Sequence, residues 1–95
     1  MTIRLAPSAV SDLAGTRDYY HEISEELEVQ FLDQLDVTME RLRTFPKGAP
    51  PVEGFPGVRR ARVRQFPYGV FYCLDDDDIL ILRVLHSRRQ LPELG

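Results

Sequence analysis

The sequence has little of several things, and each shortage excludes a class of protein. Cys73 is the only cysteine among 95 residues, so no intramolecular disulfide can form and the chain fits a reducing cytoplasm. It lies in a strand-like pattern, which indicates a small buried residue and not a nucleophile. No apolar run approaches the roughly 20 residues that a membrane helix needs, and no signal peptide is recognisable. We therefore expect a cytoplasmic protein without membrane contact.

A basic excess is also missing. The net charge of -3 argues against a dedicated nucleic-acid-binding module and against direct DNA binding by this chain. The charge is unevenly distributed, because residues 1–56 carry five basic and ten acidic residues, whereas residues 57–95 carry seven basic and five acidic ones. The second part of the chain therefore places a positive surface on an acidic protein.

The first half of the sequence has the pattern of one short strand followed by two helices. Residues 2–5 alternate polar and apolar side chains and predict a short strand. Pro7 suits the first turn of a helix, and helical spacing continues to about Glu22. Ser24 is a natural N-cap for a second helix, which Pro46 ends near Phe45. The tight turn between them predicts an antiparallel helical hairpin.

The period then changes to two. Residues 46–57 hold four prolines and three glycines and predict a loop. Three strands follow, over residues 58–64, Tyr68–Leu74 and Ile79–His86, and the last is apolar enough to be central. The order β-α-α-β-β-β predicts an α+β fold of two layers, with the hairpin packed on a mostly antiparallel four-stranded sheet. We expect one domain over residues 1–95.

The run Asp75–Asp78 resembles a metal cluster only superficially. Four consecutive carboxylates in a tight turn cannot all point at one ion, and the chain has no calcium-loop or Cys/His spacing. We interpret the run as a solvated hairpin turn. The sequence therefore predicts no metal site and no cofactor.

Several motifs together resemble the RelE/ParE superfamily of toxins from type II toxin–antitoxin systems, which includes plasmid stabilisation proteins. The resemblance covers nearly the whole chain. The motifs that carry it, in order, are Ala9-x-x-Asp12-Leu13 with Tyr19-Tyr20, Phe31-Leu32-x-x-Leu35, Leu42-x-x-Phe45-Pro46, Arg59-Arg60, Phe66-Pro67-Tyr68, Phe71-Tyr72 and Ile81-Leu82-Arg83-Val84-Leu85-His86-x-Arg88-Arg89. Each motif is weak alone, but their order and spacing make the match fairly specific.

The resemblance implies a growth-inhibiting protein that is neutralised by a cognate antitoxin. RelE-like members cut messenger RNA in the ribosomal A site, whereas ParE-like members inhibit DNA gyrase and are not nucleases. In the nuclease branch an arginine commonly occupies the position that Gly69 matches here, and lysines are common on the preceding strand, whereas Lys47 is the only lysine of this chain. These departures favour the ParE side and protein contact over catalysis.

Two alternatives stay open. A metal-independent, ribosome-dependent endoribonuclease would use Arg60, Arg62, His86 and Arg88, because arginine matches phosphate oxygens and histidine titrates near neutrality. A non-toxic binding module would keep only the antitoxin surface. The candidate residues for contact with antitoxin or target are Arg60, Arg62, Arg64, Tyr68, Tyr72, His86, Arg88 and Arg89.

Each candidate residue also has a purely structural interpretation. Arg60, Arg62 and Arg64, which alternate along the predicted strand 58–64, are also compatible with a solvated strand face. His86 is also compatible with a structural histidine at a strand end, and Arg88 and Arg89 with a solvated turn. Tyr68 and Tyr72 share a strand face, for which a core or half-buried position is the preferred interpretation.

Overall fold

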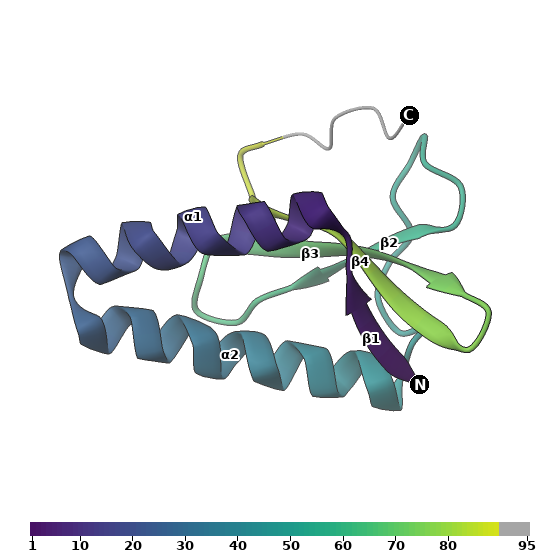
Figure 1. Ribbon diagram of the computed structural model, residues 1–95. Coiled ribbons are helices and arrows are strands. Elements are labelled where there is room, and N and C mark those ends of the chain that lie inside the picture. Colours follow the sequence, from purple (N-terminus) through teal and green to yellow (C-terminus); the bar gives the residue numbers. More distant parts are fainter. Residues whose placement is uncertain (90–95) are drawn as a thin grey trace.

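Two long antiparallel helices lie on one face of a four-stranded sheet in the computed structural model, which describes residues 1–89 (Figure 1). Residues 90–95, which the prediction of one domain over residues 1–95 includes, lie outside the described residues. The element order is strand, helix, helix and three strands, so the predicted α+β class and β-α-α-β-β-β order are confirmed.

The helical hairpin begins and ends where the sequence signals place it. α1 spans Pro7–Ile23, with proline in its first turn, and α2 spans Glu25–Thr44. The Ser24 hydroxyl accepts a hydrogen bond of 3.0 Å from the Leu27 N–H, so the predicted N-cap is confirmed. Acidic residues occupy the first turn of α2 and arginines the last, where each sign suits the helix dipole.

The sheet has the strand order β1-β4-β3-β2. β1 (Thr2–Leu5) pairs in parallel with β4 (Asp78–His86), whereas β3 (Tyr68–Asp75) pairs antiparallel with β4 and with β2 (Val58–Arg62). The sheet is therefore mostly antiparallel, as predicted, and the apolar last strand is central. β2 forms one edge of the sheet, so one side of its backbone has no neighbouring strand.

The two faces of the sheet are buried by different parts of the chain. On the inner face, the helices cover side chains such as Val63, Tyr72 and Ile81, none of which is exposed. On the outer face, a smaller cluster of Val58, Phe71 and Leu85 packs against Val52 and Phe55 of the loop 46–57 and against Leu82 of β4. Arg60 and Arg62 of β2 lie on the same outer face.

Two details differ from the expectations. The predicted strand over residues 58–64 ends at Arg62, and Arg64 lies in the following turn beside Gln65, whose φ is +69°. Only Arg60 and Arg62 therefore share the strand face on which Arg64 was expected as well. The Asp75–Asp78 run is an exposed hairpin end, as predicted, but Arg4 lies 2.7 Å from a carboxylate oxygen of Asp75 and 3.1 Å from one of Asp78.

Candidate functional site

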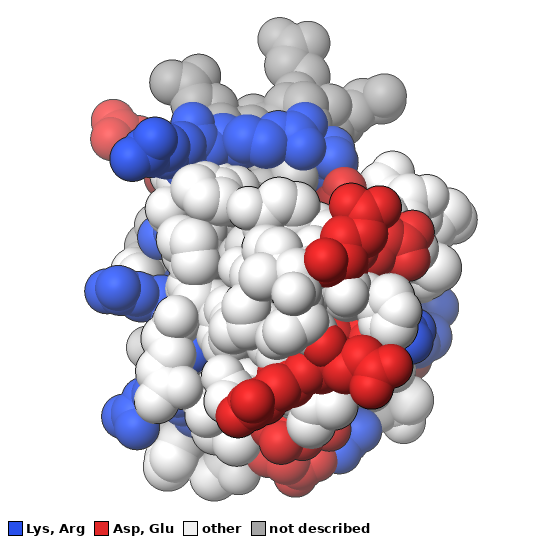
Figure 2. All heavy atoms as spheres, turned by 90° about the vertical axis from the view of Figure 1, so that its left-hand side faces the viewer, with Lys and Arg blue, Asp and Glu red and all other residues white. Residues whose placement is uncertain are grey.

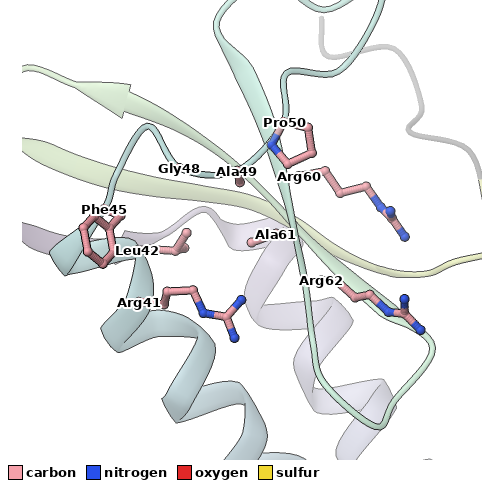
Figure 3. Close-up of a pocket in the computed structure, with 9 residues that line it drawn as sticks. All are labelled: Arg41, Leu42, Phe45, Gly48, Ala49, Pro50, Arg60, Ala61 and Arg62. Atoms are coloured by element: carbon pink, nitrogen blue, oxygen red, sulfur yellow. The ribbon is translucent and has the colours of Figure 1, made fainter.

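Arg60 and Arg62 project from the same side of β2, away from the helices, while Ala61 between them points toward α2 (Figure 3). The Arg60 guanidinium carbon lies 5.9 Å from the centre of the Phe71 ring, within the range of a cation–π contact. Gly69 makes room for this arrangement, because a Cβ atom there would lie 2.5 Å from Arg60 Nε. Arg60 thus lies over the Phe71 ring on the outer face.

The arginines around β2 differ from several others in the molecule by having no acidic partner among the described residues. Arg4, Arg17, Arg43 and Arg83 each form an ion pair with an aspartate or glutamate. Within residues 1–89, no ion pair involves the arginines that surround β2 and the end of α2, which are Arg41, Arg59, Arg60, Arg62 and Arg64. The positive charge at this edge of the sheet is therefore uncompensated by described residues.

A groove of about 590 Å³ lies between the C-terminal end of α2, the start of the following loop and β2 (Figure 3). Its apolar lining includes Leu42, Ala61 and the ring of Phe45, which is 65% exposed. Arg41 and Arg62 also line it, so an apolar groove is bordered by uncompensated positive charge. Such a combination suits an amphipathic, acidic ligand.

His86 occupies a second, separate hollow of about 370 Å³, between α1 and the ends of β3 and β4. Its ring packs edge-on against Tyr68, with 5.4 Å between the ring centres. His86 Nδ1 accepts a hydrogen bond of 3.1 Å from the Arg88 backbone N–H, which places the proton of a neutral ring on Nε2. Tyr19 and Arg89 complete the rim of this hollow.

The sequence-derived nuclease candidates are not brought together. Arg60 and Arg62 lie on the outer face, whereas His86 pairs with Tyr68 and faces the hollow beside α1 on the helix side. Arg88 is exposed in the turn after β4. One phosphate on the outer face of the sheet would therefore not meet the arginines and the imidazole together.

The two tyrosines have different positions. Tyr68 is half-buried at the edge of the His86 hollow and remains available for contact. Tyr72 has no exposed surface, and its hydroxyl donates a 2.7 Å hydrogen bond to the Pro46 carbonyl. Its inclusion among the contact residues is therefore corrected: Tyr72 is a core residue that anchors the loop after α2, and burial raises the pKa of its hydroxyl.

The sequence reasoning missed a polar cluster where α1 crosses the sheet. Asp12 accepts hydrogen bonds of 2.7 and 3.0 Å from the Arg83 guanidinium and one of 3.0 Å from the Val84 N–H. This hydrogen bonding raises the pKa of Arg83. β1 pairs with β4 only up to Ile81, so the Asp12 carboxylate satisfies an edge donor that no strand covers. In the sequence, the only indication of this contact is that Asp12 and Arg83 both belong to motifs that carry the family resemblance.

Acidic side chains gather at the opposite end of the molecule. Figure 2 looks onto the end where the helical hairpin turns, and red patches lie across it with basic side chains at the margins. The first turn of α2 supplies Glu25, Glu26 and Glu28 there, and His21 Nδ1 lies 2.9 Å from Glu28 Oε1. The helical turn therefore carries a concentration of acidic side chains, in contrast to the arginines of β2, which form no ion pair within residues 1–89.

Two kinds of feature are absent from residues 1–89. Neither α1 nor α2 contains an apolar stretch long enough to cross a membrane. No three His, Cys, Asp or Glu side chains in this range are grouped so that they could hold a metal ion.

The small α+β fold, with a helical hairpin on one sheet face and an arginine-bearing edge, defines a chain of the RelE/ParE type. A family model described as the ParE toxin of type II toxin–antitoxin systems, parDE, matches residues 3–91. The chain therefore belongs to the ParE toxin family. No curated protein sequence matches it.

Solved structures show the same fold. A chain of the chromosomal ParDE TA system from P. aeruginosa is 23% identical, with a TM-score of 0.78, over 90% of this chain and 95% of that one. A chain of the E. coli DinJ-YafQ toxin-antitoxin complex is 17% identical, with a TM-score of 0.65, over 90% of each chain. A second structure of the E. coli DinJ-YafQ complex has 16% identity and a TM-score of 0.60, over 90% of this chain and 91% of that one.

Proposed function

We propose that this ParE-family toxin stops growth by binding DNA gyrase, without cutting nucleic acid, and that a cognate antitoxin neutralises it by covering part of its surface. Family membership supports the toxin role. The observation that favours protein contact over catalysis is the separation of Arg60 and Arg62 from His86 on opposite faces of the sheet.

Chemistry explains why this separation matters. Metal-independent RNA cleavage needs a base, an acid and a cation around one phosphate, each within hydrogen-bonding distance of its atom. Arg60, which would contribute the cation, rests against Phe71 on the outer face. The space at Gly69, where the nuclease branch commonly has an arginine, is already filled by the Arg60 side chain. A binding surface requires no such convergence.

The direct test is a supercoiling assay with purified gyrase and purified toxin. We expect supercoiling to fall as toxin is added, and to recover when the antitoxin co-expressed from the neighbouring gene is added. Full gyrase activity at excess toxin, with growth still arrested in cells, would contradict the gyrase proposal. No arrest of growth on expression would instead favour a non-toxic module that keeps only the antitoxin surface.

A ribosome-dependent endoribonuclease is the second candidate, and the His86 hollow is the observation that favours it. Imidazole, the Tyr68 ring and Arg89 surround a space of about 370 Å³, and an aromatic ring can stack on a base. Toe-printing of translating ribosomes tests this directly. Cuts in the A site that disappear with His86→Gln would establish the nuclease, whereas intact messenger RNA would leave the hollow a structural feature.

A further inference from the structure

β1 forms the second edge of the sheet, at the opposite end of the strand order from β2 (Figure 1). The Ala6 N–H donates a 2.8 Å hydrogen bond to the Ile81 carbonyl, so the even-numbered residues of this strand direct their backbone groups toward β4. The N–H and carbonyl groups of Ile3 and Leu5 therefore face away from the sheet. Within residues 1–89 no backbone–backbone hydrogen bond involves these four groups, so the edge is open to a further strand.

An apolar hollow borders the β1 edge on the helix side. It has two adjoining parts, of about 490 and 300 Å³, and Leu5 and Leu13 line both of them. Met39 of α2 lies in the larger part and Val10 of α1 in the smaller one. The fold leaves 39% of Leu5 and 54% of Val10 exposed. Exposed apolar side chains beside unpaired strand backbone are the features of an association surface.

The arginines around the β1 edge have acidic partners, in contrast to those around β2. Arg4, which belongs to β1, lies 2.7 Å from a carboxylate oxygen of Asp75 and 3.1 Å from one of Asp78. Arg43 and Arg17, which line the two parts of the hollow, each pair with a glutamate. Two β1 edges can therefore approach each other without opposing unpaired arginines, whereas two copies of the β2 edge would repel each other.

From these features we infer that two copies of this chain associate through their β1 edges, in antiparallel orientation about a two-fold axis. Pairing centred on Arg4 sets Ile3 of one copy opposite Leu5 of the other, so that all four outward backbone groups of each strand gain a partner. Leu5 of each copy then packs over the hollow of the other copy. Each acidic turn adjoins Thr2, so the antiparallel orientation places the two turns at opposite ends of the paired strands.

A second copy suits this edge because the edge is complementary to itself. It carries both the unpaired backbone groups and the hollow, together with the apolar side chain that fills the hollow, as a two-fold interface requires. β1 has only 4 residues, so the association is weak and depends on concentration. Since β1 and β2 are opposite edges, the dimer leaves both arginine-bearing edges exposed. The inference goes beyond the proposed function, because the association needs neither gyrase nor antitoxin.

Sedimentation equilibrium of the purified full chain over a series of concentrations measures the association. We expect a monomer–dimer equilibrium whose dissociation constant rises about tenfold or more in Leu5→Lys and in Ile3→Pro. The proline removes an outward N–H and leaves the pairing with β4 intact. Val37→Lys is the matched control, because Val37 is an apolar residue with 49% exposure that lines neither part of the hollow, and its dissociation constant should equal that of wild type. A thermal melt confirms that each variant is folded.

A disulfide tests the register. The two copies of Arg4 face each other in a position without hydrogen bonds between them, where Cα atoms lie about 4.5 Å apart, within the range that a disulfide spans. With the native cysteine removed by Cys73→Ser, Arg4→Cys should form a covalent dimer on mild oxidation. Thr2→Cys, on the same face of the same strand, is the control, because the two copies of Thr2 would lie more than about 13 Å apart.

The outcomes separate this inference from the proposed function. A monomer at every concentration, or equal effects of Leu5→Lys and Val37→Lys on the dissociation constant, would overturn the dimer through β1. Equal crosslinking of Arg4→Cys and Thr2→Cys would overturn the antiparallel pairing. Conversely, a dimer with the expected variant effects in a protein that neither arrests growth nor inhibits gyrase would remove the proposed function and keep the interface.

Discussion

Replacing Asp12 by alanine should be among the most damaging single changes in this protein, because its carboxylate joins α1 to the central strand β4. Its carboxylate accepts three hydrogen bonds, two from the Arg83 guanidinium and one from the Val84 N–H, at 2.7 to 3.0 Å. The two side chains are 11% and 18% exposed. This pair is the main polar attachment of α1 to the sheet.

The expected loss in the free energy of unfolding depends on the Arg83 charge, which stays largely buried without a partner after the substitution. Removing one partner of a fully buried ion pair costs about 3–5 kcal/mol, because the other charge stays buried, whereas exposed pairs contribute at most about 1 kcal/mol. Since some solvent reaches both side chains, we expect Asp12→Ala to lower the free energy of unfolding by about 2–3 kcal/mol. Asp12→Asn keeps one acceptor for the Val84 N–H and should cost about half as much.

Equilibrium urea unfolding measures this directly. The matched control is Glu40→Ala, which breaks the exposed pair with Arg43 on α2 and should cost less than about 0.5 kcal/mol. A shift in the midpoint without a change in slope would show that stability alone is altered. If Asp12→Ala and Glu40→Ala cost the same, the interpretation of Asp12 as the attachment of α1 is wrong.

Three further changes have definite expected results. The pKa of His21 is raised, mainly by its hydrogen bond to Glu28 of α2. Protonated His21 therefore stabilises the folded protein fully below about pH 6.5, and this stabilisation is lost as the pH rises through the folded-state pKa. The melting temperatures of His21→Gln and wild type should accordingly converge at alkaline pH. Gly69→Ala should displace Arg60 and cost about 1 kcal/mol, an effect that should vanish in an Arg60→Ala background in a double-mutant cycle. Tyr72→Phe should cost about 1 kcal/mol and speed amide exchange in residues 46–57, whereas Tyr19→Phe, at an exposed position, should change neither.

The elements could be predicted because their signals are local. Pro7 and Ser24 mark helix starts whatever the rest of the chain does, and both helices begin where those residues predict. The change of period from 3.6 to two marks the sheet in the same way. The prediction that the first of the three later strands runs to residue 64 was wrong, because β2 ends at Arg62. The alternation of side chains continues into the turn, and the turn shows itself only in the backbone, in the positive φ of Gln65.

The site was less predictable because it depends on which side chains meet across the fold. Nothing local shows that Arg60 and His86 lie on opposite faces of one sheet, or that Asp12 reaches Arg83 across 71 positions. The groove combines the end of α2 with the edge of β2, and nothing local in the sequence shows that the exposed ring of Phe45 lines it. Face and edge assignments require the strand order, which the sequence pattern does not specify.

The most direct test of the central proposal, that this toxin acts by binding and not by catalysis, is the stoichiometry of its inhibition of gyrase. Supercoiling should be measured at fixed gyrase over a series of toxin concentrations and incubation times, with wild type and His86→Gln side by side. Inhibition that saturates near equal concentrations, does not increase with time and is the same for both proteins is the predicted result. Intact supercoiling, together with messenger RNA cleavage that proceeds at substoichiometric toxin and is lost with His86→Gln, would contradict it.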